Sequence, residues 1–154
     1  MADQGQKNPE EKISCTFICS RDTLDGAYPS LVLGLNAVRL GMEATIFYTF
    51  MGINVIRKNY QDKCRFIPPG PLGAIPGMSA MATKMMRQKM DAAHIPSLGE
   101  LLEMAQIEGI RLVACKMTVD MMGLSQNDFI DGVEIQTAED YLKHAIHCRI
   151  NMFT

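Results

Sequence analysis

The sequence predicts one α/β domain of the flavodoxin-like type, in which helices sandwich a parallel β-sheet. Short apolar segments rich in β-branched and aromatic residues alternate with longer segments whose apolar residues recur at helical spacing. This alternation is typical of parallel sheets with right-handed crossovers. A length of 154 residues fits one domain, and 47% hydrophobic residues are enough for a core. We therefore expect a disordered tail at residues 1–12 and a single domain at residues 13–154.

The strands are predicted from apolar runs bounded by turn residues. Residues 13–19 form a compact run bounded by charged and turn residues, which predicts a parallel strand buried on both faces, and residues 43–50 are β-branched and aromatic. Two shorter strands are predicted at residues 111–115 and 133–136. A strand order of 2-1-3-4 would make the ends of the first and third strands neighbours at the switch point, where ligands bind in such sheets.

Helices are predicted between these strands, at residues 23–40, 78–93, 98–108, 117–123, 125–130 and 138–146. Ser97 and Glu100 have the spacing of a capping box, and Thr137 can cap the last helix. Residues 58–77 are rich in proline and predict a long loop, which in a compact domain is often a lid or a binding loop.

Methionines are concentrated in the helix predicted at residues 78–93. Met78, Met81 and Met85 share one face of this helix, which predicts a buried or oligomeric surface because methionine fills irregular apolar gaps. This apolar surface suggests that one protomer of this size cannot cover all of it, so we expect a homo-oligomer.

Composition excludes several classes of function. The net charge of −2 provides no basic surface for nucleic acid. No apolar run approaches the roughly 20 residues of a membrane span, and the polar start of the chain does not resemble a secretory signal, so we expect a cytoplasmic protein without stable membrane insertion. Neither a phosphate-binding glycine motif nor a zinc-protease motif is present, and we expect no organic cofactor and no metal.

Cys115 is the strongest candidate for a functional residue. It ends a predicted strand and directly precedes the helix start at Lys116, Met117 and Thr118. Free backbone N–H groups at a helix start and a nearby lysine both favour the thiolate, which is the reactive form of cysteine. The alternative is that Cys115 is a small apolar residue that packs at the end of a strand.

The other cysteines suggest weaker hypotheses. Cys19 ends the first strand and is a candidate to line the same site as Cys115, although a core position is the alternative. His144, His147 and Cys148 have the spacing of one helix face and could approach a single metal ion. Histidines near the end of a helix more often complement its dipole, so the metal hypothesis is the weaker of the two.

Three segments resemble the DsrE/DsrF/DsrH-like sulfurtransferases, in the DsrE-like branch often described as peroxiredoxin family proteins. These segments start at TFICSRDTLDG, at PGMSAMATKMM and at IPSLGELLEMAQ, and the resemblance covers about residues 13–146. The block ACKMTVDMMG is its most specific part. The family's cysteine matches Cys115, and its motif continues at Asp120.

The resemblance implies a parallel α/β fold, an oligomer and the handling of sulfane sulfur. It implies that Cys115 accepts sulfur as a persulfide or thiosulfonate from small sulfur compounds and passes it to TusA-type or rhodanese-type carriers. Lys116, Met117, Thr118 and Asp120 would support the sulfur. Two alternatives stay open: a carrier that holds sulfur without catalysing turnover, and a structural subunit in which Cys115 is simply buried.

Overall fold

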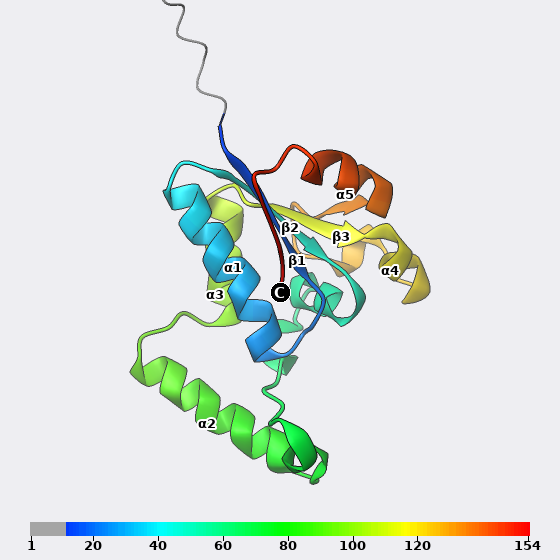
Figure 1. The fold of residues 1–154 in the computed structure, drawn as a ribbon. Helices are drawn as coiled ribbons and strands as arrows, with labels where there is room; N and C mark the ends of the chain where they lie inside the picture. The colour runs from blue at the N-terminus through cyan, green and yellow to red at the C-terminus, as the bar shows by residue number, and fades with distance from the viewer. Residues whose placement is uncertain (1–11) are drawn as a thin grey trace, which may run out of the picture.

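The computed structural model describes residues 12–154, so the tail predicted at residues 1–12 lies outside the described residues except for Lys12. One sheet of five parallel strands forms the centre of the domain, in the order β4-β3-β2-β1-β5 (Figure 1). The strands are β1 Ser14–Cys19, β2 Glu43–Tyr48, β3 Arg111–Cys115, β4 Glu134–Gln136 and β5 Ile150–Phe153. The predicted α/β fold with a parallel sheet is confirmed.

The predicted strand order is wrong, because β2 lies between β1 and β3. The chain adds β2, β3 and β4 in one direction and then returns to place β5 beside β1. The strand β5 was not predicted from the sequence. It is only four residues long, and its residues are half-buried or exposed. The direction of addition changes between β1 and β5, so β3 is not at the switch point.

The helices are α1 Leu24–Arg39, α2 Met78–Ala92, α3 Leu98–Ile107, α4 Lys116–Met121 and α5 Ala138–Ala145. Both predicted caps at Ser97 and Thr137 are confirmed: Ser97 forms a capping box with Glu100, and the Thr137 hydroxyl accepts a hydrogen bond from the backbone N–H of Asp140. The helix predicted at 125–130 is reduced to a 3₁₀ turn, Gln126–Asp128. The loop predicted at 58–77 contains two further 3₁₀ turns.

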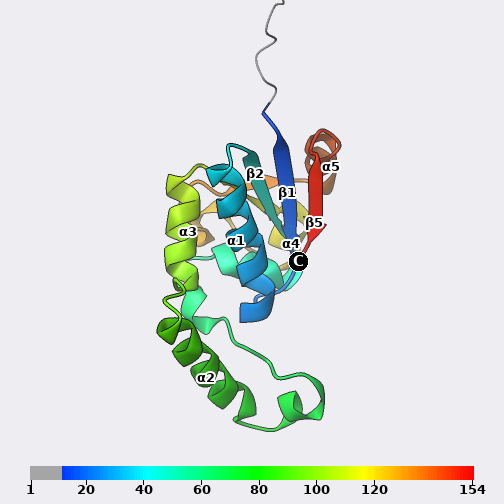
Figure 2. The same ribbon diagram turned by 60° about the vertical axis from the view of Figure 1, so that its left-hand side comes forward.

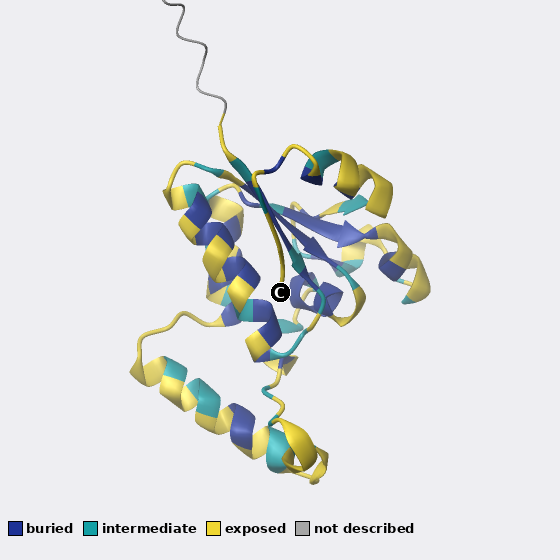
Figure 3. Cartoon of the chain, in the orientation of Figure 1, coloured by how far each residue is buried: buried dark blue, intermediate teal, exposed yellow. Residues whose placement is uncertain are grey.

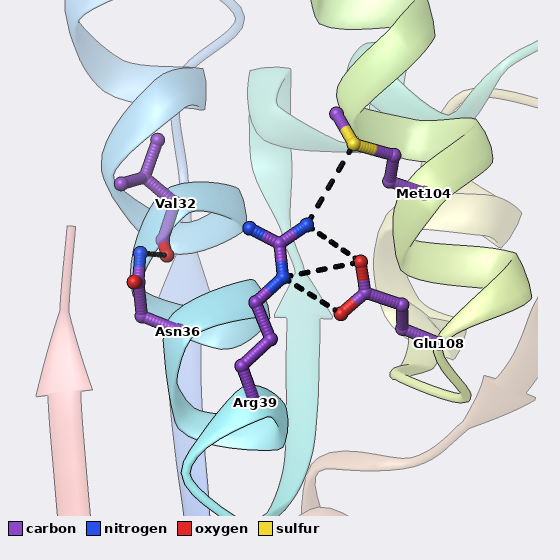
Figure 4. A network of polar contacts seen from close by, with 5 residues as sticks. All are labelled: Val32, Asn36, Arg39, Met104 and Glu108. Carbon is purple, nitrogen blue, oxygen red and sulfur yellow. Dashed lines mark hydrogen bonds and ion pairs between the residues drawn. The ribbon is translucent and has the colours of Figure 1, made fainter.

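The larger core lies on the face of the sheet that α1 and α3 cover (Figures 1 and 3). Leu31 of α1 and Ile46 of β2 are completely buried in it. Each such side chain contributes about 1.5–3 kcal/mol through removal of its surface from water. Arg39 of α1 also binds Glu108 after α3, with Nη2 2.6 Å from Oε1 (Figure 4). This pair joins the two helices at the rim of the core.

The opposite face of the sheet has a smaller core under α5. Its buried residues are Phe47, Val113, Cys115, Tyr141 and Ala145. Successive side chains of a strand point to opposite faces, so the last residues of β3 divide between the two cores. Leu112 and Ala114 belong to the α1 face, and Cys115 belongs to the α5 face.

The helix α2 projects away from the sheet as an arm (Figure 2). Thr83 connects it to the preceding loop, because its hydroxyl accepts a hydrogen bond from the backbone N–H of Phe66 at 2.9 Å. The methionine face predicted to be buried is open in the single chain: Met81 is 63% exposed and Met85 is 52% exposed. The oligomer expected from this face stays a prediction. Among residues 12–154, no helix has the length and apolar character needed to span a membrane.

Candidate functional site

Cys115 lies at the junction between β3 and α4. It is the last residue of β3, and its extended backbone (φ −68°, ψ 116°) makes it the N-cap of α4. The first backbone N–H groups of a helix have no acceptor within the helix, so those at the start of α4 are free for other acceptors. The structure therefore confirms the predicted position of the Cys115 thiol, at the end of a strand and the start of a helix.

Tyr141 of α5 packs over the same face of the sheet as Cys115, and only 3% of the Cys115 surface is exposed. The Tyr141 ring stacks on Phe47 of β2, with 4.3 Å between ring centroids. Its hydroxyl accepts a hydrogen bond from Thr16 of β1 at 3.1 Å. Burial raises the pKa of the Tyr141 phenol, which therefore stays neutral. Tyr141 was not predicted to lie at the site. Its position in the apolar stripe of the last helix indicated that its ring is buried against the sheet.

Thr118 fixes α4 to the segment that follows β2. Its side chain is completely buried, and its Oγ1 accepts a hydrogen bond from the backbone N–H of Phe50 at 3.1 Å. The Thr49 hydroxyl lies 3.3 Å from the same oxygen. Phe50 has a φ of 45°, a left-handed conformation that is rare for an aromatic residue and needs support from its surroundings. Thr118 provides part of that support, so its hydroxyl is already engaged by the protein.

Lys116 and Asp120 form an ion pair along one turn of α4. The Lys116 Nζ lies 2.5 and 2.6 Å from the two carboxylate oxygens of Asp120. Both side chains are at least half exposed, so solvent screens the pair and it adds little stability. The carboxylate of Asp120 therefore lies against Lys116, the cation that was predicted to favour the Cys115 thiolate. Met117 is 61% exposed and lies on the outer surface.

Cys19 is not close to Cys115 in the fold. It belongs to the core on the α1 face, whereas Cys115 belongs to the core on the α5 face, and β2 separates their two strands. Its Sγ is 3.7 Å from the carbonyl oxygen of Gly26, and burial raises its pKa to about 11. Cys19 therefore does not line the site around Cys115, because the predicted strand order on which that proximity depended is wrong.

Of the three residues of the metal hypothesis, the structure brings two, His144 and Cys148, into contact. His144 Nε2 lies 3.5 Å from Cys148 Sγ. Within the described part of the chain, no three His, Cys, Asp or Glu side chains gather in a group that could hold a metal ion.

The contacts of Thr118 lead to a prediction about stability. We expect Thr118→Val to lower the free energy of unfolding by about 1–3 kcal/mol, because it leaves the partly buried N–H of Phe50 without its acceptor. Urea unfolding followed by circular dichroism measures the change. Thr49→Val is the control, since it removes only the hydroxyl–hydroxyl contact and should have the smaller effect. Equal effects of the two substitutions would show that the bond to Phe50 is not important.

The fold and the thiol at the end of β3 define a single-domain α/β protein with a cysteine-centred site. The model of the DsrE/DsrF/DrsH-like family matches residues 9–153. The chain therefore belongs to this family, as the resemblance of its sequence motifs predicted.

Two relatives match over most of their length. The chain is 34% identical to the sulfur carrier protein DsrE2 of Allochromatium vinosum over 151 residues, which is 88% of this chain and 94% of that protein. It is 29% identical to the uncharacterized protein YrkE of Bacillus subtilis over 157 residues, which is 94% of this chain and 98% of that protein.

Solved structures support the fold. The YchN protein of Escherichia coli superposes with a TM-score of 0.63 at 14% identity, covering 93% of this chain and 99% of that chain. The protein MTH1491 of Methanobacterium thermoautotrophicum superposes with a TM-score of 0.50 at 14% identity, covering 92% and 99%. At this level of identity the two structures show that the fold is shared.

Proposed function

We propose that this protein is a cytoplasmic sulfur-transfer protein, which accepts sulfane sulfur on Cys115 and passes it to a partner sulfur carrier. The observation that carries the proposal is the position of Cys115 at the end of β3 and the start of α4, in a family whose members include a named sulfur carrier. A thiol at this junction lies next to backbone N–H groups that favour a negative charge.

The proposed transfer is a displacement at sulfur, which follows the same rules as thiol–disulfide exchange. With tetrathionate as donor, the Cys115 thiolate attacks a central sulfur atom, the central S–S bond breaks and thiosulfate leaves. Cys115 then carries a thiosulfonate group. In the second step the thiolate of a partner carrier attacks the sulfane sulfur of this adduct. The bond between that sulfur and Cys115 Sγ breaks, the thiosulfonate group passes to the carrier, and the thiolate of Cys115 is restored. Neither step needs a metal or an organic cofactor.

Burial of Cys115 requires that the site opens during transfer. The side chains of Tyr141 and Phe47 cover the sheet beside the thiol. Beside the exposed Lys116, the surface at the start of α4 includes two apolar side chains, Met117 and Phe50, both more than half exposed. We propose that a partner carrier of the TusA or rhodanese type, or a second copy in a homo-oligomer, contacts this surface when sulfur is exchanged.

The substitution Cys115→Ser tests the proposal. We expect incubation with tetrathionate or polysulfide to add sulfur to the tryptic peptide at residues 112–116, and Cys115→Ser to abolish that adduct because serine cannot form the S–S bond. Mass spectrometry with peptide mapping measures the gain. Cys64→Ser is the matched control and should keep the adduct, since burial raises the pKa of the Cys64 thiol to about 12.

The 3% exposure of Cys115 favours a second candidate, in which the protein is a structural subunit and Cys115 only packs the core. The two candidates predict different reactivity. A sulfur-accepting thiol reacts with iodoacetamide in the native protein, whereas a packing residue stays unmodified until the protein unfolds. Steady-state turnover with small donors and acceptors, without a partner protein, then distinguishes an enzyme from a carrier that only holds sulfur.

A further inference from the structure

We propose that Cys148 and His144 form a second thiol site, in which His144 is the base and Cys148 attacks the S–S bond of a small disulfide or polysulfide. The site lies where the chain leaves α5 and enters β5, at the amino end of the sheet (Figure 1). Cys115 lies at the carboxyl end. The two thiols are therefore separate sites of one domain.

The geometry brings the thiol and the imidazole into contact. His144 is near the end of α5 and Cys148 follows one turn later. Cys148 Sγ lies 3.5 Å from His144 Nε2, within the range of a hydrogen bond to sulfur. The hydroxyl of Thr45 in β2 lies 3.0 Å from the same nitrogen and holds the ring against the sheet. Unprotonated Nε2 has one lone pair, so it accepts the proton of Cys148 when the Thr45 hydroxyl donates elsewhere. A base within hydrogen-bond distance of its nucleophile is the geometry that an activated thiol requires.

The surroundings keep the imidazole neutral and able to accept a proton. Burial lowers the pKa of His144, and the positive charges of Arg111 and His147 lower it further. Glu43 and Glu134 act in the opposite direction but do not reverse the shift. Burial also raises the pKa of the Cys148 thiol. Near neutral pH the pair is therefore a thiol next to a neutral imidazole, and His144 can take the proton when the sulfur attacks.

Two cavities next to the pair give room for a small reagent. The two neighbours of Cys148 in sequence, His147 and Arg149, line a cavity of about 400 Å³ together with Ser14. His144 and Thr45 line a second cavity of about 590 Å³. Cys148 itself lines neither cavity and is 8% exposed, so a reagent reaches its sulfur only when the neighbouring residues move slightly.

The proposed reaction is balanced without any further oxidant. Cys148 attacks one sulfur of the disulfide as its proton moves to His144 Nε2. A new S–S bond forms at Cys148, the original S–S bond breaks, and the leaving thiolate takes the proton from His144. The product is a mixed disulfide on Cys148 and one free thiol, the normal outcome of thiol–disulfide exchange.

The rate of modification of Cys148 by bis(2-hydroxyethyl) disulfide tests the proposal. Cys148 is followed in the tryptic peptide at residues 144–149, which contains no other cysteine. We expect His144→Gln to slow the reaction near neutral pH by about tenfold or more, because the base is lost. The matched control His94→Gln removes an exposed imidazole just after α2, away from the pair, and should react like the wild type. An unchanged rate in His144→Gln, or a Cys148 that reacts only after unfolding, would overturn the proposal.

The pH dependence in the unmodified protein provides an independent measurement that does not rely on a variant folding correctly. With His144 as base, the rate rises as the imidazole loses its proton, below its ordinary pKa of about 6.5, and then becomes constant. An unassisted thiol would instead react about tenfold faster with each pH unit up to its own raised pKa. That steady rise would contradict the proposal. Cys115→Ser should leave the Cys148 rate unchanged, so failure at one thiol is distinguishable from failure at the other.

Discussion

Replacing Tyr141 by alanine is expected to lower the free energy of unfolding by about 3–5 kcal/mol and to expose Cys115. The substitution removes the ring that stacks on Phe47 and the acceptor of the Thr16 hydroxyl. It also leaves a cavity in a core of only five buried residues. Denaturant unfolding measures the loss of stability, and alkylation of the tryptic peptide at residues 112–116 measures the exposure of Cys115.

Tyr141→Phe is the control for this substitution. It keeps the stacked ring and removes only the hydroxyl, so we expect a loss of about 1 kcal/mol and no faster alkylation of Cys115. Cys15 is an internal reference, because it is completely buried on the opposite face of the sheet. Faster alkylation of both cysteines in Tyr141→Ala would indicate general unfolding. Slow alkylation of Cys115 in that variant would show that another part of the fold limits access to the thiol.

The second large effect is expected at Gly52, in the 3₁₀ turn Phe50–Ile56 that follows β2. A Cβ at this position would lie 2.2 Å from the carbonyl oxygen of Cys19 and 2.7 Å from its carbonyl carbon. These are backbone atoms at the end of β1, and they cannot move aside as a flexible side chain could. We therefore expect Gly52→Ala to lower the free energy of unfolding by about 3 kcal/mol or more.

Gly99→Ala is the matched control for Gly52→Ala. Gly99 lies in the first turn of α3, and a Cβ there would meet no atom within 4 Å. Alanine is the better helix former, so we expect this variant to be more stable by about 0.5–1 kcal/mol. Urea unfolding of both variants makes the comparison. Equal changes in the free energy of unfolding for the two variants would show that the backbone at Gly52 can move away from β1.

Most of the fold is predictable because its signals are local. The apolar runs at β1, β2 and β3 and the capping box at Ser97 depend on residues close together in sequence, and the structure has all of them. The strand order depends on which strand pairs with which, and that information is not in any single segment. The strand β5 was missed because its four residues, Ile150–Phe153, are too few to show a periodic pattern, and Asn151 interrupts their apolar run.

The same distinction applies to the candidate site. The position of Cys115 between a strand and a helix follows from neighbouring residues and was predicted correctly. Its cover comes from Tyr141 and Phe47, which are distant in sequence and meet only after α5 packs on the sheet. The placement of Cys19 beside Cys115 depended on strand order and was therefore wrong.

The arm formed by α2 has a consequence for how the family can vary. Thr83 and Arg87 bind backbone atoms of the loop at residues 62–66, and the helix stands apart from the sheet (Figure 2). Distant sites with no shared contacts affect stability additively. Substitutions of the outward methionines of α2 should therefore not alter the packing around β3. The sequence of the arm can therefore vary while the packing at the strand ends is preserved.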